Sequence, residues 1–151
     1  FKVGDYVRLG AVEGIVQEIT INYAKILTIG NNTVSVSNLQ ILDRDVTNYT
    51  VEGNKKNSLH CYTFELGFNH SVPTEKISSI FNEAFDSIQI RLPRKPTAVL
   101  HRSDALGRVY MIYLYVENPE DIFALKTKVA EEVFRRWDAE RKIEKVNISQ
   151  S

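Results

Sequence analysis

Apolar and polar residues alternate along FKVGDYVRLGAVEGIVQEI, the first nineteen residues of the chain, and glycine interrupts the alternation at positions 4, 10 and 14. A period of two is typical of a strand with one buried face. Glycine within a strand marks a bulge, a sharp bend or the close approach of another backbone. A phosphate-binding loop would instead need a glycine cluster at the start of a helix. The glycines therefore favour short strands that bend tightly.

The strand pattern continues to Leu42 and includes a strong turn signal at Gly30-Asn31-Asn32. Several short strands joined by tight turns are typical of a small β-barrel or sandwich. We therefore predict a first domain over residues 1–47, a barrel of the Sm-like or SH3-like kind. Its expected strands are residues 3–9, 11–20, 21–29, 33–36 and 39–42.

A polar stretch, Val46 to Ser58, is predicted to connect this domain to a second one with a different rhythm. The expected elements of the second domain are a strand at 59–68, a helix from Pro73, strands at 97–101 and 109–116, a helix from Pro119 to about Arg141 and a weak last strand at 143–148. The order β-α-β-β-α-(β) is typical of a ferredoxin-like domain with two helices over one sheet face. We expect it at residues 53–149, which makes the whole chain α+β.

Charge and cysteine content exclude several classes of function. Lysine plus arginine and aspartate plus glutamate number 19 each, so no bulk attraction to nucleic acid or anionic lipid is expected. Cys61 is the single cysteine, which excludes an internal disulfide and any multi-cysteine metal site. His60 and Cys61 are neighbours on a predicted strand, so their side chains point to opposite faces and do not suit shared ligation. His70 falls in a predicted turn, and His101 ends a strand.

Paired carboxylates offer one more candidate for chemistry. Asp43 and Asp45 would share a face in an extended chain, as the two carboxylates of an acid-base site do. Arg44 between them and the polar linker beyond favour a solvated edge instead. The sequence also holds no phosphate loop and no nucleophile with an adjacent base. We therefore predict no enzyme activity, no cofactor and no metal ion.

A tyrosine-rich strand raises a different hypothesis, the stacking of single-stranded nucleic acid on aromatic rings. Tyr113 and Tyr115 share one face with Met111, whereas Tyr110 lies on the other, apolar face. One face is predicted to be core and the other a contact surface. A soluble Sm-like plus ferredoxin-like module that binds RNA or protein is therefore an alternative function. The neutral charge of both halves weighs against RNA.

The pattern FKVGDYVRLGAVEGIVQEI…KILTIGNNTVSVSNLQIL resembles the soluble β-domain of MscS-type (small-conductance) mechanosensitive channels. That family shows F-x-x-G-[DE]-x-V, then G-x-V-x-x-I, then a short strand that ends in [IV]-P-N. The matching positions here are Phe1, Gly4, Asp5, Val7, Gly14, Val16, Ile19, Val36 and Asn38. The order of barrel, polar linker and β-α-β-β-α unit is also the family's, so the resemblance covers the whole chain.

The resemblance implies a membrane channel, usually a homoheptamer, with this part on the cytoplasmic side of the cell membrane. The pore-lining helix would end just before Phe1. The β-domains would form a ring, and the second domains a hollow vestibule with side openings for ions and small osmolytes. An apolar surface at Val34 to Leu42 is the expected contact with a neighbouring subunit, and Leu39 and Ile41 are the candidate interface residues.

Two departures from the family pattern stand out. Ser37 takes the place of the usual proline, so the turn there is less rigid. The glycine- and proline-containing segment that normally leads to a terminal β-barrel is not recognisable after the last helix. Residues 143–148 are instead expected to pair along the edge of the sheet.

Overall fold

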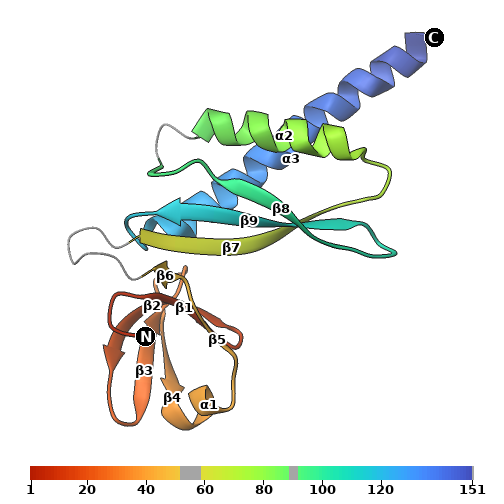
Figure 1. Cartoon of the computed structure of the whole chain (residues 1–151). Coiled ribbons are helices and arrows are strands. Elements are labelled where there is room, and N and C mark those ends of the chain that lie inside the picture. The colour runs from red at the N-terminus through yellow and green to blue at the C-terminus, as the bar shows by residue number, and fades with distance from the viewer. Residues whose placement is uncertain (52–58, 89–91, 151) are drawn as a thin grey trace. The chain divides into compact units, whose positions relative to one another are not determined.

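The computed structural model describes residues 1–51, 59–88 and 92–150, and for residues 143–150 it describes the backbone alone. The chain divides into two compact units. The first takes in Phe1–Tyr62 and Tyr115–Phe123, and the second takes in Thr63–Leu114 and Ala124–Ser151. The fold is mixed α+β with antiparallel strand pairs, as the sequence predicted, and Figure 1 labels its elements.

A five-stranded sheet in the order β4-β3-β2-β1-β5 makes up most of the first unit. Its strands are β1 (Tyr6–Leu9), β2 (Val12–Ile19), β3 (Tyr23–Leu27), β4 (Thr33–Ser37) and β5 (Val46–Asn48). Every neighbouring pair is antiparallel. The inward side chains form one apolar cluster: Val7, Leu9, Val16, Ala24, Ile26 and Val36. The predicted period of two is therefore confirmed here.

Gly14 lies where two backbones come close together. A Cβ on Gly14 would stand 2.0 Å from the carbonyl oxygen of Leu27, on the neighbouring strand β3. Only glycine fits this approach. The irregularity in the ladder is displaced from Gly14, because the register shifts between Val16 and Glu18. Glycine thus permits the close approach, and the bulge follows it along β2.

Residues 39–42 form a helix, so the predicted strand there is wrong. The helix α1 spans Asn38–Leu42. The amide nitrogen of the Asn38 side chain donates to the carbonyl oxygens of Thr20 and Ile21, at 3.1 and 2.8 Å. This contact anchors the chain at the point where β4 ends. Three apolar residues in a five-residue window cannot distinguish a period of two from one of 3.6.

The polar stretch after residue 45 is also more ordered than predicted. Val46–Asn48 is the strand β5, which pairs with β1, and Thr50–Val51 is the short strand β6. All three side chains of β5 are exposed. A strand held through its backbone at the edge of a sheet leaves no hydrophobic pattern, which explains the error. The rest of the predicted connection, residues 52–58, lies outside the described residues.

The second sheet has the order β6-β7-β9-β8. Its longer strands are β7 (Leu59–Phe68), β8 (Thr97–Ser103) and β9 (Arg108–Val116), and the two helices are α2 (Thr74–Ile88) and α3 (Asp121–Gln150). The start of β7 and the end of β9 belong to the first unit, and the remainder of both strands belongs to the second. The predicted order β-α-β-β-α is confirmed.

The core of the second unit lies between its strands and helices. Every predicted apolar position of α2 is buried: Ile77, Ile80, Phe81, Ala84, Phe85 and Ile88. The Phe81 ring packs on Phe68 of β7 and Tyr110 of β9, with centroids 5.7 and 5.2 Å apart. Val129 and Val133 add the buried stripe of α3. Both helices cover one face of this sheet (Figure 1).

Residues 143–148 continue α3, so the predicted last strand is wrong. The helix runs from Asp121 to Gln150 without a break. No glycine or proline stands between Pro119 and the end of the chain. Without such a breaker, a stretch rich in Glu, Lys and Arg extends the helix at little cost.

Candidate functional site

Two leucines of α1 form a strongly exposed apolar pair in the first unit. Leu39 and Leu42 are 76% and 81% exposed, and their i,i+3 spacing puts them on one side of the helix. Ile41 points the other way and packs partly against the apolar cluster. Ile21, whose carbonyl accepts the Asn38 bond, is 90% exposed. We call Ile21, Leu39 and Leu42 the α1 surface.

The family-motif residues of the first turn hold the start of the chain in place. Gly4 has a φ of +94°, which favours glycine. Asp5 is buried, and one of its carboxylate oxygens accepts bonds from the backbone nitrogen of Lys2 and the side-chain amide of Asn48, at 3.0 and 2.9 Å. The aspartate therefore ties the turn to β5.

The other motif residues divide into core and surface. Val7, Val16 and Val36 belong to the apolar cluster, whereas Phe1 and Ile19 are both 44% exposed. The motif therefore describes how the first unit folds, and no chemical group other than the Asp5 carboxylate stands out within it.

A polar cluster that the sequence did not predict surrounds Glu13 on β2. Its carboxylate accepts bonds from the hydroxyls of Tyr6 and Tyr62, at 3.2 and 3.0 Å, and from the guanidinium of Arg8. Burial, and then the Glu13 charge, raise the pKa of both tyrosines far above the ordinary value. The tyrosines therefore stay protonated and act as hydrogen-bond donors. The cluster is suited to stabilising the fold and not to proton transfer.

Sequence order hides this cluster, because Tyr62 is 49 residues from Glu13. Its ring packs on Tyr6 and Tyr49, with centroids 5.5 and 4.9 Å away. Of these contacts, only the one between Arg8 and Glu13 could be predicted from the sequence, since the two residues face each other across the β1–β2 hairpin. The cluster therefore joins distant parts of the first unit and stabilises its fold.

The histidine and cysteine candidates have separate contacts. His60 is buried, with Nδ1 2.7 Å from the hydroxyl oxygen of Thr50, and burial lowers its pKa. Cys61 is half-buried. His70 contacts the carbonyl oxygen of Asp104, and His101 lies 3.7 Å from Glu65. Among the described residues, no three His, Cys, Asp or Glu side chains gather as a metal site would require.

Asp43 and Asp45, the candidate carboxylate pair, are both exposed beside the end of α1. No bond from either side chain to another described residue points to an acid-base site.

Within the described part of the chain, no helix combines the length and the apolar character needed to cross a membrane.

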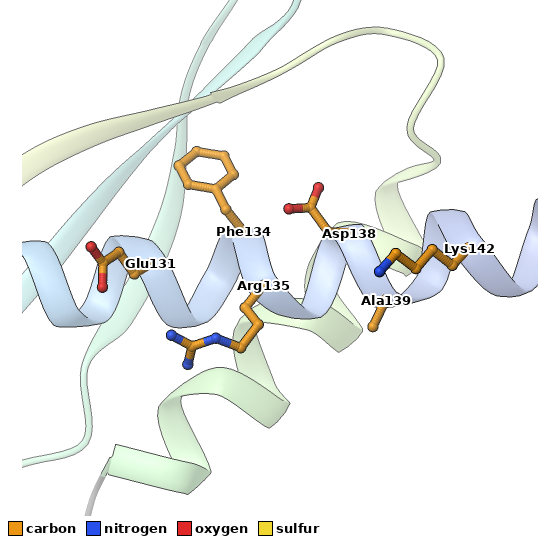
Figure 2. A pocket seen from close by; sticks show the side chains of 6 residues that line it. All are labelled: Glu131, Phe134, Arg135, Asp138, Ala139 and Lys142. Carbon is orange, nitrogen blue, oxygen red and sulfur yellow. The ribbon is translucent and has the colours of Figure 1, made fainter.

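A surface hollow of about 570 Å³ follows the outward side of α3 (Figure 2). Phe134 and Asp138 project on one side of the helix, and Arg135 and Ala139 on the other (Figure 2). Its four charges alternate as Glu131, Arg135, Asp138 and Lys142, so they cancel. Opposite charges four residues apart are typical of a solvated helix face. This hollow therefore holds no net field for a charged ligand.

The comparisons with known proteins agree with one another. Residues 1–51 match the family described as "Mechanosensitive ion channel, beta-domain". An uncharacterized MscS family protein of Synechocystis sp. is 24% identical over 141 residues, which are 93% of this chain and 46% of that protein. Residues 1–51 are thus similar to the channel β-domain, and most of the chain is similar to an MscS family protein.

A second relative of this chain is the small-conductance mechanosensitive channel MscMJ of Methanocaldococcus jannaschii. It is 28% identical over 96 residues, which cover 62% of this chain and 26% of the channel. The crystal structure of Helicobacter pylori MscS in its closed state shares the fold, with a TM-score of 0.56 and 13% identity over 92% of this chain and 53% of that one.

The chain thus spans less than half of the length of the curated relatives it matches. The family that residues 1–51 match is one of ion channels and not of enzymes. The resemblance that the glycine motif predicted is confirmed.

Proposed function

We propose that this chain is the cytosolic vestibule and assembly part of a tension-gated mechanosensitive channel that releases ions and small osmolytes on hypo-osmotic shock. The observation that carries the proposal is the match of residues 1–51 to the channel β-domain, followed by a second α/β unit in the order of H. pylori MscS. In the full protein a pore-lining helix would precede Phe1, and this part would lie on the cytoplasmic side of the cell membrane.

The two domains would divide the work. The β-domain, over residues 1–47 and closed as an Sm-like barrel, would form a ring with its neighbours in a homo-oligomer, expected to be a heptamer. The ferredoxin-like domain, over residues 53–149, would enclose the vestibule and its side openings. Such a vestibule needs shape and a modest field, and no nucleophile or cofactor.

The α1 surface is the contact that we propose between neighbouring subunits. Burying a leucine side chain stabilises an assembly by about 1.5–3 kcal/mol, so Leu39 and Leu42 would each favour the ring. Of the two predicted interface residues, Leu39 is free to meet a neighbour. Ile41 already packs partly on its own core and would support the interface from behind.

Bilayer tension shifts a closed–open equilibrium because the open state occupies more membrane area. The size of the shift is set by the difference in area between the two states. This chain would therefore act as filter and scaffold, with the tension sensor in the membrane segments.

The test is patch-clamp recording of the full protein in liposomes under graded suction, with protein-free liposomes as the control. We expect currents that rise with suction and that change in ion preference when charges lining the side openings are reversed. A protein that inserts and assembles, yet passes no current up to membrane rupture, would contradict the proposed function.

A further inference from the structure

A second cavity in the second unit lies between the end of β7, the turn after it and α3. It has a volume of about 340 Å³. Its walls include Phe68 and Ser71 on one side and Phe134, Trp137 and Arg141 on the other. Small-molecule sites in proteins begin at about 300 Å³. We call this cavity the β7–α3 cleft.

One wall of the β7–α3 cleft is aromatic. The spacing of Phe134, Trp137 and Arg141 along α3 is i, i+3 and i+7, which aligns the three side chains on one stripe of the helix. Phe134 remains 39% exposed although its ring lies 6.0 Å from that of Phe68. Lys76 lies over the Trp137 ring, with Nζ 5.9 Å from the centroid. A flat apolar group could therefore pack against Phe134 and the edge of Trp137.

The charge beside this wall is positive. Among the described residues, Arg141 is exposed and makes no hydrogen bond or ion pair. Arg108 donates to the carbonyl oxygen of Val72 in the cleft wall, at 3.0 Å, and that bond leaves its charge uncompensated. The other nearby cation, Lys76, is offset by Glu140 at 3.6 Å.

A free guanidinium beside an aromatic wall selects one kind of ligand. Its planar fork matches a carboxylate or phosphate through two parallel hydrogen bonds. The aromatic rings favour a planar apolar body over a small hydrated ion. The Ser71 hydroxyl supplies a further polar group at the rim.

We propose that the β7–α3 cleft binds a small organic anion, in which a carboxylate or phosphate is attached to a planar apolar body. Arg141 holds the anionic group, and Phe134 and Trp137 hold the body. The hollow on the outward side of α3 shares Phe134, but its balanced charges give it no preference for anions. This site is independent of the channel function proposed above.

The chain carries its own reporter, because Trp137 is its single tryptophan. Benzoate and phenyl phosphate are titrated into the purified chain while the fluorescence of Trp137 is recorded. Benzamide serves as the neutral counterpart, and inorganic phosphate as the anion without an apolar body. We expect saturable quenching by the two aromatic anions, weakened by added salt, and at least about ten-fold weaker binding of benzamide and inorganic phosphate.

Two variants locate the site. Arg141→Gln should weaken the binding of phenyl phosphate by about ten-fold or more and bring it close to that of the neutral counterpart. Lys142→Gln removes the same charge from the next residue, which does not line the cleft, and should leave affinity within about two-fold. Phe134→Leu should weaken the binding of the aromatic anions and leave the binding of inorganic phosphate unchanged. Ligand-observed NMR measures both.

Each of these results would overturn the proposal: no saturable response to either aromatic anion, equal affinity for benzoate and benzamide, or equal losses in Arg141→Gln and Lys142→Gln. Urea unfolding of each variant verifies that the fold is intact, and loss of binding in a folded Arg141→Gln protein supports the site. If inorganic phosphate alone competes as well as phenyl phosphate, the aromatic wall has no role and the proposed ligand class is wrong.

Discussion

The hydroxyl of Tyr62 donates to both carboxylate oxygens of Glu13, each at 3.0 Å. The same carboxylate accepts from Arg8 and Tyr6. One side chain of β2 thus connects two residues of β1 with the start of β7. Charge-assisted hydrogen bonds of this kind are among the stronger ones in proteins.

Replacing Glu13 should therefore destabilise the first unit. Glu13→Gln keeps the shape but removes the charge, and we expect a loss of about 1.5–3 kcal/mol in the free energy of unfolding by urea. Glu18→Gln is the matched control on the same strand, because Glu18 forms only an exposed pair with Lys25 at 3.5 Å. Its effect should stay within about 0.5 kcal/mol. Equal effects of the two changes would contradict the cohesive role of Glu13.

Gly14→Ala should be among the most damaging small changes in the chain. Its Cβ would stand 2.0 Å from the Leu27 carbonyl oxygen, so the β2–β3 pair must separate. We expect a loss of at least about 2 kcal/mol, measured by thermal or urea unfolding. Gly67→Ala, also within a strand, meets its nearest atom at 4.0 Å and should be close to neutral. If the Gly14→Ala protein were as stable as Gly67→Ala, β3 could move away from position 14 at little cost in stability, and the prediction would be wrong.

Stability should decrease in mild acid because of His60. Burial lowers the pKa of His60 below 6.5, and the nearby Asp5 charge opposes only part of this effect. Between the two pKa values the unfolded chain binds more protons than the folded one. The stabilisation is therefore complete above pH 6.5 and is lost as the pH falls toward the lower, folded pKa. In urea unfolding, the free energy of unfolding should therefore rise with pH across this range. His60→Asn should reduce this slope, whereas His101→Asn, at an exposed position, should retain it.

Assembly of the full protein should depend on Leu39 more directly than on Ile41. Leu39→Asp places a charge on the α1 surface and should shift the oligomer toward smaller species in native mass spectrometry, with normal unfolding of the chain. Ile41→Asp should lower stability itself, because Ile41 packs on the apolar cluster. Val99→Asp, at an exposed position on β8, controls for the added charge. Intact oligomers in a Leu39→Asp, Leu42→Asp double variant would exclude this interface.

The histidines and the cysteine should be dispensable for current. Alanine at His60, Cys61, His70 or His101 should leave suction-gated current in the full protein, once membrane abundance is matched. A stability loss of about 1–3 kcal/mol is expected for His60, which is buried. A variant that assembles normally and passes no current would show that one of these side chains has a functional role.

Burial patterns along single elements were accessible from the sequence. Tyr110, Ile112, Leu114 and Val116 alternate on β9, and all four are buried, whereas Met111 and Tyr113 are not. The alternation works because successive side chains of a strand point to opposite faces, so burial leaves its period in the sequence. The apolar spacing of α2 is confirmed for the same reason.

Features that depend on the backbone or on distant partners were not accessible. The strand β5 pairs with β1 while its side chains stay exposed, so its sequence carries no burial signal. The bonds of Asn38 to Thr20 and Ile21 connect residues 18 and 17 positions apart, respectively. The β7–α3 cleft joins a turn near Ser71 to Arg141 on α3. The local periodicity of apolar residues does not predict such contacts between distant parts of the chain.

The close approach at Gly14 also limits how this sequence can diverge. The atom that a side chain would meet is a main-chain oxygen, which is present whatever residue occupies position 27. A second substitution cannot remove it, so no compensating change restores a larger residue at position 14. Gly107 of the second unit is in the same situation, since its Cβ would lie 2.2 Å from the carbonyl oxygen of Phe68. Related chains can drift at almost every contact made by side chains, but at these two positions a lineage must retain glycine or rebuild the strands around it.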